Sequence, residues 1–115
     1  MQYYNEEKMH DFRLRLEKEI LSWPGATTKK MYGCPCYKYK DKLFAFMVTD
    51  GVVLVKVNEV DRNKLSTEFE MKPFQAGEKR TMSLWPQIRI EKIADLERIL
   101  PYIKNCYTSS KTSKE

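Results

Sequence analysis

Apolar residues spaced three and four positions apart predict an amphipathic helix over residues 5–21. They are Met9, Phe12, Leu16 and Ile20, and they fall on one face of a helix. Asn5 is a suitable N-cap, and two glutamates follow it in the first turn, where the helix dipole favours negative charge. The helix is expected to end at Trp23-Pro24-Gly25, because proline cannot extend it and glycine permits a turn.

Two strands are expected next, over residues 27–32 and 36–40. Gly33 and Pro35 are expected to break the chain between them. The second strand alternates regularly, so that its two tyrosines face one side of the sheet and the intervening residues face the other. A tight turn at Lys40-Asp41 then leads into a third strand.

The strongest turn signal is Asp50-Gly51, which lies between apolar runs over residues 43–48 and 52–55. Asp-Gly in this setting predicts a β-hairpin, because both central positions of the favoured turn need a positive φ. Both runs are apolar on both faces, whereas a strand with one face in water alternates. The hairpin, over residues 43–57, is therefore predicted at the middle of a sheet, with helices, loops or a second subunit covering each face.

Two more helices are predicted in the second half of the chain. Asn58 caps the first, which runs to about Phe69, with Asp61 at the reciprocal position of a capping box. Val60, Leu65 and Phe69 are expected to form its narrow apolar side.

Residues 71–90 contain two prolines and a glycine, so they are expected to be irregular or to form one or two edge strands. The last helix is predicted over residues 93–107. Pro101 lies inside its apolar pattern and predicts a kink or a break there.

Together these elements predict an α+β fold, in which an antiparallel β-meander is flanked by an N-terminal, a middle and a C-terminal helix. A length of 115 residues suits one domain, which we assign to residues 1–107. Residues 108–115 are small and polar, and are expected to form a disordered tail.

The composition is that of an ordinary globular protein, with 42% hydrophobic and 12% aromatic residues. No apolar run approaches the ~20 residues needed to cross a bilayer, so no membrane association is expected. The N-terminal segment is polar and acidic and does not resemble a secretory signal. We therefore predict a cytoplasmic protein.

The cysteines favour reduced thiols over a disulfide or a metal site. Cys34 and Cys36 are separated by one residue, which on an extended chain puts both thiols on one face in poor geometry for a disulfide. Structural zinc sites pair cysteines two to four residues apart and need a second pair, which Cys106 and His10 do not supply. We expect neither a metal nor a cofactor. A nucleophilic role for Cys34 or Cys36 would require neighbouring lysines to lower the thiol pKa.

The sequence contains no catalytic or phosphate-binding motif that we can identify. His10 is the only histidine, and no Asp or Ser lies at the spacing of a catalytic triad motif. We expect it to be exposed on the first helix. With four glycines, the chain has neither the Rossmann nor the P-loop pattern.

Basic residues concentrate in the middle of the chain, and the net charge is +5 with a pI near 9.1. If the sheet brings them together among the neighbouring aromatic residues, they would form a surface suited to nucleic acid. The candidate binding residues are Lys29, Lys30, Lys38, Lys40, Lys72, Lys79 and Arg80. The alternative is that these residues only protect exposed strands against edge-to-edge aggregation.

Several short segments form a recognisable pattern: Lys30-Met31-Tyr32-Gly33, Cys36-Tyr37-Lys38, Lys42-Leu43-Phe44-Ala45-Phe46, Asp50-Gly51 and Lys72-Pro73-Phe74. With these segments, residues 5–107 resemble the N-terminal domain of the TfoX competence-regulator family, and also the YjbR group of small domains. Cys34 and Asp41 stand where the family pattern has glycine. The matched residues are mainly turn and core positions, so they specify a fold more than a site.

The resemblance implies a regulatory or interaction module that binds nucleic acid, a protein partner or a second copy of itself. A homodimer would cover the second face of the central hairpin. The alternative, from a different class, is a small thiol-dependent or ligand-binding enzyme that uses Cys34 or Cys36.

Overall fold

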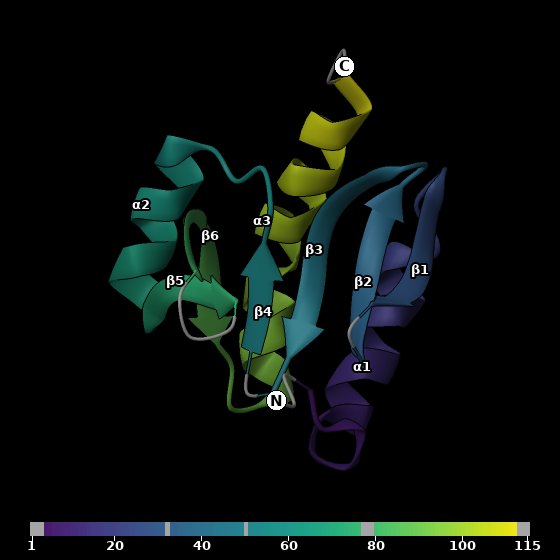
Figure 1. Cartoon of the computed structure of the whole chain (residues 1–115), viewed down its shortest axis with the longest axis horizontal. Helices are drawn as coiled ribbons and strands as arrows, with labels where there is room; N and C mark the ends of the chain where they lie inside the picture. The colour runs from purple at the N-terminus through teal and green to yellow at the C-terminus, as the bar shows by residue number, and fades with distance from the viewer. Residues whose placement is uncertain (1–3, 32, 50, 77–79, 113–115) are drawn as a thin grey trace.

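The protein has three helices and one six-stranded antiparallel sheet (Figure 1). The computed structural model describes residues 4–31, 33–49, 51–76 and 80–112, with the side chains of residues 75–84 outside that description. The elements in chain order are α1 (Glu6–Ile20), β1 (Ala26–Met31), β2 (Cys34–Tyr39), β3 (Lys42–Val48), β4 (Gly51–Leu54), α2 (Glu59–Glu68), β5 (Met71–Ala76), β6 (Arg80–Arg89) and α3 (Ile93–Thr112). The strand order β1-β2-β3-β4-β6-β5 is that of a meander with one exchange at its end. The predicted α+β fold is confirmed.

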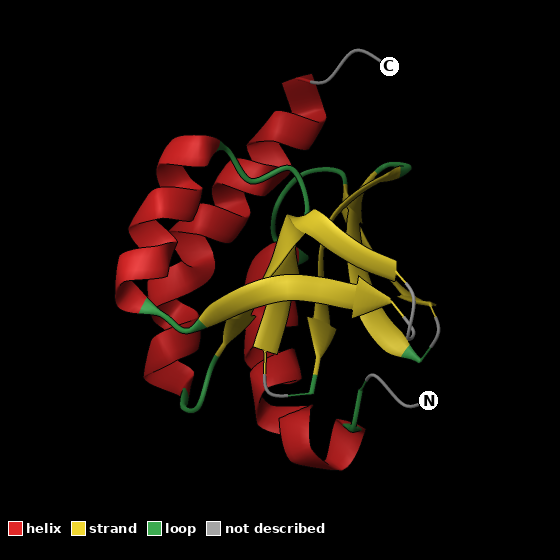
Figure 2. Ribbon diagram, turned by 60° about the vertical axis from the view of Figure 1, so that its left-hand side comes forward, coloured by secondary structure: helices red, strands yellow, loops and turns green. Residues whose placement is uncertain are grey.

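Helices α1 and α3 cover one face of the sheet. Both lie behind the strands in Figure 1, and the rotated view of Figure 2 shows the same layering. Helix α3 packs mainly on β3 and β2, while α1 packs on β1 and α3. The residues between these layers include Leu16, Ile20, Leu96, Ile99 and Ile103, all fully buried. Burial of each such side chain contributes about 1.5–3 kcal/mol, so this layer contributes substantially to the stability of the fold.

Helix α1 begins where the sequence predicts. Asn5 is its N-cap and accepts a hydrogen bond from the Lys8 backbone N–H at 3.3 Å. The chain then turns at Gly25, whose φ of 79° suits glycine and whose Cα lies too close to the Tyr39 ring for a side chain.

Strand β2 begins two residues earlier than predicted, at Cys34. Pro35 lies inside it and pairs with Lys30 of the edge strand β1, so the expected break at Pro35 is wrong. The β2–β3 pairing starts only at Cys36, and a proline at this margin of the sheet is tolerated. The turn before β2 is made by Gly33, with a φ of 80°.

The predicted central hairpin is confirmed, since β3 and β4 are the two middle strands. Its turn lies one position earlier than predicted, because Val48 pairs with Gly51 and the glycine is therefore the first residue of β4. Asp50 lies outside the described residues. A side chain at Gly51 would collide with the Ile88 carbonyl oxygen, so glycine is needed there for the close approach of β6.

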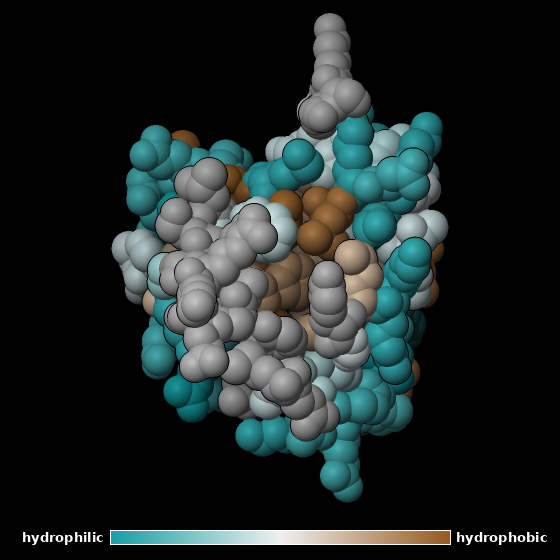
Figure 3. Space-filling view, viewed as in Figure 1, coloured by the Kyte–Doolittle hydropathy of each residue, from teal (hydrophilic) through white to brown (hydrophobic). Residues whose placement is uncertain are grey.

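A row of directly paired residues crosses all six strands on the face opposite α1 and α3, which we call the open face. Its members are Lys29, Cys36, Phe46, Val53, Gln87 and Lys72. A bulge in β3 leaves Phe44 without a partner in β2, so Phe44 points to the helices although Phe46 does not. Figure 3 shows apolar residues at the centre of the open face and hydrophilic ones along its β1–β2 side.

Strands β5 and β6 cover part of the open face, which corrects the prediction that residues 71–90 form only edge strands. Strand β6 lies between β4 and β5 and is internal. Pro73 pairs with Pro86, but the next residue, Phe74, pairs with Met82. Residues 83–85 of β6 therefore have no partner in β5, and the hairpin bends there. Phe74 and Trp85 then pack on Phe46, with ring centroids 5.0 and 6.0 Å away. This hairpin supplies a cover that the apolar central strands require.

Helix α2 has the predicted cap, in which Asn58 accepts from the Asp61 N–H at 2.7 Å. Val60 was expected on its apolar side, but it is 63% exposed, so that prediction is wrong. Asn105 of α3 donates to the buried Asp61 carboxylate at 2.8 Å and ties the two helices together.

Helix α3 runs without a break through Pro101 to Thr112. Of the two predicted outcomes at Pro101, a break is therefore excluded. Residues 108–112 belong to the helix and Ser110 is fully buried, so the prediction of a disordered tail is wrong for them. Residues 113–115 lie outside the described residues. Among the helices described, none is long and apolar enough to span a membrane.

Candidate nucleic-acid interface

Four of the predicted binding residues lie on neighbouring strands at one edge of the sheet. Lys29 and Lys30 are on the edge strand β1, Lys38 is on β2, and Lys40 is in the β2–β3 turn with a φ of 55°. Lys29 pairs with Cys36, and Lys38 pairs with Thr27, so alternation puts Lys29 and Lys38 on the open face. Lys29, Lys30 and Lys40 are exposed and Lys38 is half-buried.

Two lysines of α3, on the helix-covered side of the sheet, lie around the same aromatic residues as Lys40 of the β2–β3 turn. The Lys104 Nζ lies 4.8 Å from the Trp23 ring centroid and 5.7 Å from that of Tyr107. The Lys111 Nζ lies 5.4 Å from the Tyr107 ring. Neither lysine was predicted from the sequence, although positions 104, 107 and 111 follow one face of a helix and could have indicated the arrangement.

A packed aromatic cluster holds these lysines in place. Tyr107 is at its centre, with ring centroids 5.1 Å from Trp23, 5.7 Å from Tyr39 and 5.6 Å from Phe44. The Tyr107 hydroxyl donates to the Pro24 carbonyl oxygen and fixes the end of α3 to the turn after α1. The Lys40 Nζ lies 5.5 Å from the Tyr39 ring, so the turn lysine and the helix lysines surround the same cluster.

We call six basic residues of this region the lysine corner; its members are Lys29, Lys30, Lys38, Lys40, Lys104 and Lys111. Residues 26–44 contain five lysines against one aspartate, and residues 98–112 contain no acidic residue at all. Glu6, Glu17 and Glu19 of α1 are instead paired with arginines of the same helix, as in the Arg13–Glu17 pair. Both segments therefore carry a local excess of positive charge.

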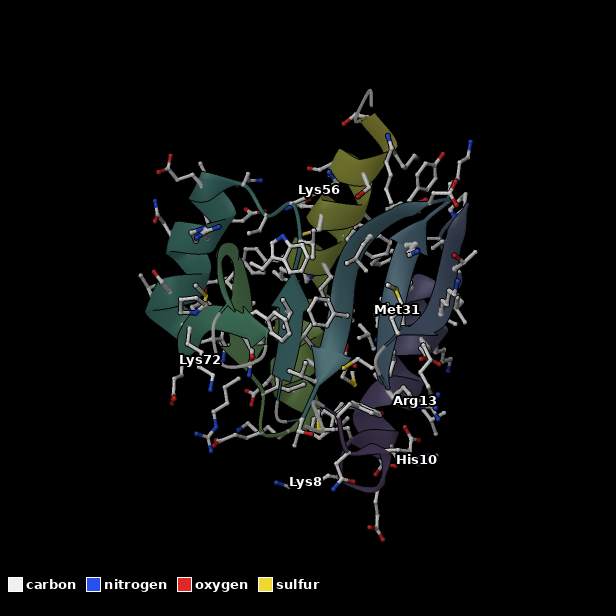
Figure 4. All side chains as sticks on the ribbon, viewed as in Figure 1. Lys8, His10, Arg13, Met31, Lys56 and Lys72 are labelled. Carbon is white, nitrogen blue, oxygen red and sulfur yellow. The ribbon has the colours of Figure 1, made fainter. Side chains whose placement is uncertain are left out.

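The other predicted binding residues do not join the lysine corner. Lys72 is on β5, at the opposite edge of the sheet, and Figure 4 shows it on the far side of the molecule from Met31 of β1. Lys29 and Lys72 are the two ends of the six-strand row, about 24 Å apart for a flat sheet with strands ~4.8 Å apart. Lys79 and the Arg80 side chain lie outside the described residues. Lys72 is therefore on the same open face as Lys29 but at the opposite edge of the sheet, away from the lysine corner.

The thiols lie in surroundings that disfavour nucleophilic chemistry. Cys34 and Cys36 are 3% and 5% exposed. Burial raises the pKa of Cys34 to about 11, and the adjacent Cys36 adds to that effect. Burial also raises the pKa of Cys36, and it raises the pKa of Cys106 to about 12. All three thiols are therefore protonated at neutral pH, the opposite of what an activated cysteine requires.

His10 belongs to a polar network that joins α1 to β2. Its Nδ1 lies 2.9 Å from Glu6 Oε2, and Glu6 also accepts from Arg13 Nε at 2.8 Å. Arg13 donates to Glu17, which in turn accepts from the Tyr37 hydroxyl at 3.0 Å. The Arg13 guanidinium holds the Glu6 pKa well below its usual range. These contacts dock the helix on the sheet and present no nucleophile.

Comparisons with known proteins found no matching family model, no similar curated protein and no similar solved structure. In the described parts of the chain, no three His, Cys, Asp or Glu side chains are grouped so that they could hold a metal ion. The family resemblance stays a prediction from the sequence.

Proposed function

We propose that this chain is a small nucleic-acid-binding interaction module, of the kind implied by its resemblance to TfoX N-terminal domains, and that the lysine corner is its contact surface. The observation that carries the proposal is the convergence of Lys40, Lys104 and Lys111 on one rigid aromatic cluster. These lysines come from a strand turn and from a helix more than 60 positions later, so their meeting is a property of the fold.

The aromatic residues support the lysines but offer little ring surface to bases. Tyr107 and Trp23 are 1% and 6% exposed, and Tyr37 is fully buried. Tyr39 is half-buried and already contacts Tyr107. Stacking of bases therefore contributes little, and we expect ammonium groups to contact phosphates without reading sequence. Binding should depend strongly on salt and weakly on sequence.

The proposal predicts the size of the salt dependence. Each phosphate neutralised on a single strand contributes about −0.7 to the slope of log K against log salt. Contacts from all six residues of the lysine corner would give a slope near −4. Loss of three of these contacts should reduce the magnitude of the slope by about 2.

The test is a fluorescence-anisotropy titration of a labelled single strand of mixed sequence, and of its duplex, at about 50 and about 200 mM salt. The variant K40Q/K104Q/K111Q removes three charges from the lysine corner. The control K64Q/K72Q/K92Q removes three exposed charges elsewhere and has the same net charge. For the corner variant, we expect the slope of log K against log salt to be smaller in magnitude by about 2 than for wild type. The control should bind like wild type. Equal weakening of both variants would show a general effect of net charge, and no binding by wild type at low salt would rule out the proposal.

The alternatives lose part of their support in the structure. The thiol-dependent enzyme would use Cys34 or Cys36, which are buried and have raised pKa values. The homodimer was inferred from the uncovered second face of the central hairpin, and Phe74 and Trp85 now cover Phe46 there. Nucleic acid is the partner that best suits the remaining exposed charge.

A further inference from the structure

Three sulfur-containing residues lie together on the open face of β1 and β2. Met31 and Cys34 are direct cross-strand partners, and Cys36 follows Cys34 on the same face. The Cys36 Sγ lies 3.5 Å from the Cys34 carbonyl oxygen, so the thiol points back along the strand toward Cys34. Cys106, the third cysteine, is on α3 and packs on the other side of the sheet. Figure 4 marks the place of this group by the Met31 label.

We propose that Met31, Cys34 and Cys36 form a binding site for a single Cu(I) ion. Thiolate and thioether sulfurs are soft ligands that select Cu(I), which is satisfied by two or three of them. Structural Zn²⁺ needs four ligands, and the described residues group no third His, Cys, Asp or Glu with these two cysteines. This site lies beside the lysine corner but does not depend on nucleic-acid binding.

The spacing that disfavours a disulfide suits a bridging ion. Residues two apart on a strand have Cα atoms about 6.7 Å apart, near the upper limit for a disulfide and beyond its preferred range. A metal ion between the two sulfurs fills the extra distance. A disulfide would have to draw the strand together, whereas the ion leaves its backbone in place.

The surroundings of the thiols provide a dry site with positive charge at its margin. Binding releases one proton from each cysteine, so Cu⁺ and two thiols give a complex with a net charge of −1. Lys29 is the cross-strand partner of Cys36, and the positive charge of Lys38 already acts to lower the Cys36 pKa. Both lysines therefore compensate the charge of the complex. Met31 is half-exposed and the space around Gly33 is open, which provides a path for entry.

The test is an anaerobic titration of the full chain with Cu(I), in competition with a chromogenic Cu(I) chelator. We expect one Cu(I) per chain, and release of two protons should raise the affinity up to about 100-fold per pH unit near neutrality. C34A and C36A should each lower the affinity at least 100-fold. M31L should lower it about tenfold, and the control C106A should leave it unchanged.

Thermal melting with and without Cu(I) separates loss of the site from loss of the fold. Wild type and C106A should melt at a higher temperature with the ion, whereas C34A and C36A should fold but show no increase. Equal weakening by C106A, one ion shared by two chains, or tighter binding of Zn²⁺ would overturn the proposal. Because the titration contains no nucleic acid, its failure and the failure of the lysine corner are distinguishable.

Discussion

The contact of Phe46 with Phe74 tests whether the β5–β6 hairpin covers the open face. The two rings meet edge to face with centroids 5.0 Å apart and an interplanar angle of 85°. Such pairs contribute about 0.5–1.5 kcal/mol beyond the area that they bury. F46L and F74L keep most of the apolar volume, so each should destabilise the protein by about 1–2 kcal/mol and leave it folded.

The interaction free energy between Phe46 and Phe74 is measured by urea unfolding of wild type, F46L, F74L and the double variant. We expect the double variant to be about 0.5–1.5 kcal/mol more stable than the sum of the single changes predicts. Near 115 residues, 1 kcal/mol corresponds to about 4 °C in melting temperature, so thermal unfolding can confirm each value.

The matched control pairs F74L with F44L, because Phe44 points to the opposite side and contacts Trp23 and Tyr107. The destabilising effects of F74L and F44L should add within about 0.3–0.5 kcal/mol in the double variant. Additivity of F46L with F74L as well would show that the hairpin does not pack on the open face, and it would restore the need for another cover such as a second subunit.

Three other changes have expected outcomes. S110A should stabilise the protein by about 1 kcal/mol in urea unfolding, because the Ser110 Oγ is fully buried without a hydrogen-bond partner among the described residues, and destabilisation would show that it has one. N58A should cost about 1 kcal/mol through loss of the α2 cap and its contact with Asp61, and a neutral result would contradict the cap. The free energy of unfolding should fall as pH rises from about 9 to about 11, because the raised pKa values of Cys34 and Cys106 keep both thiols protonated in the folded state while the unfolded state loses these protons. C34A should flatten this pH dependence, and an unchanged profile in C34A would refute the assignment to this thiol.

The central sheet could be predicted from the sequence because its pattern is local. The apolar runs of β3 and β4 and the turn between them are contiguous, and their two-faced apolarity identified the middle of the sheet. Strand β6 could not be recognised in the same way. Pro86 argues against an internal strand, but its partner in β5 is another proline, Pro73, and the β4 pairing of β6 stops one residue away, at Gln87.

The lysine corner could be predicted only in part, for a related reason. Lys29, Lys30, Lys38 and Lys40 are close in sequence and lie on the adjacent strands β1 and β2 and the turn after them. Lys104 and Lys111 reach them through Tyr107, a contact between distant segments that no local pattern specifies. Lys72 was grouped with them because the order of the last two strands, which puts β5 at the far edge, was unknown.

The most direct test of the proposed function is to map the contact surface by NMR. Amide shifts of the labelled full chain would be followed during titration with a mixed-sequence single strand at low salt. We expect the largest changes in β1, in the β2–β3 turn and in the last two turns of α3, with reversal on addition of salt. Changes confined to β5 and the far edge of the sheet, or no changes at all, would contradict the assignment of the lysine corner.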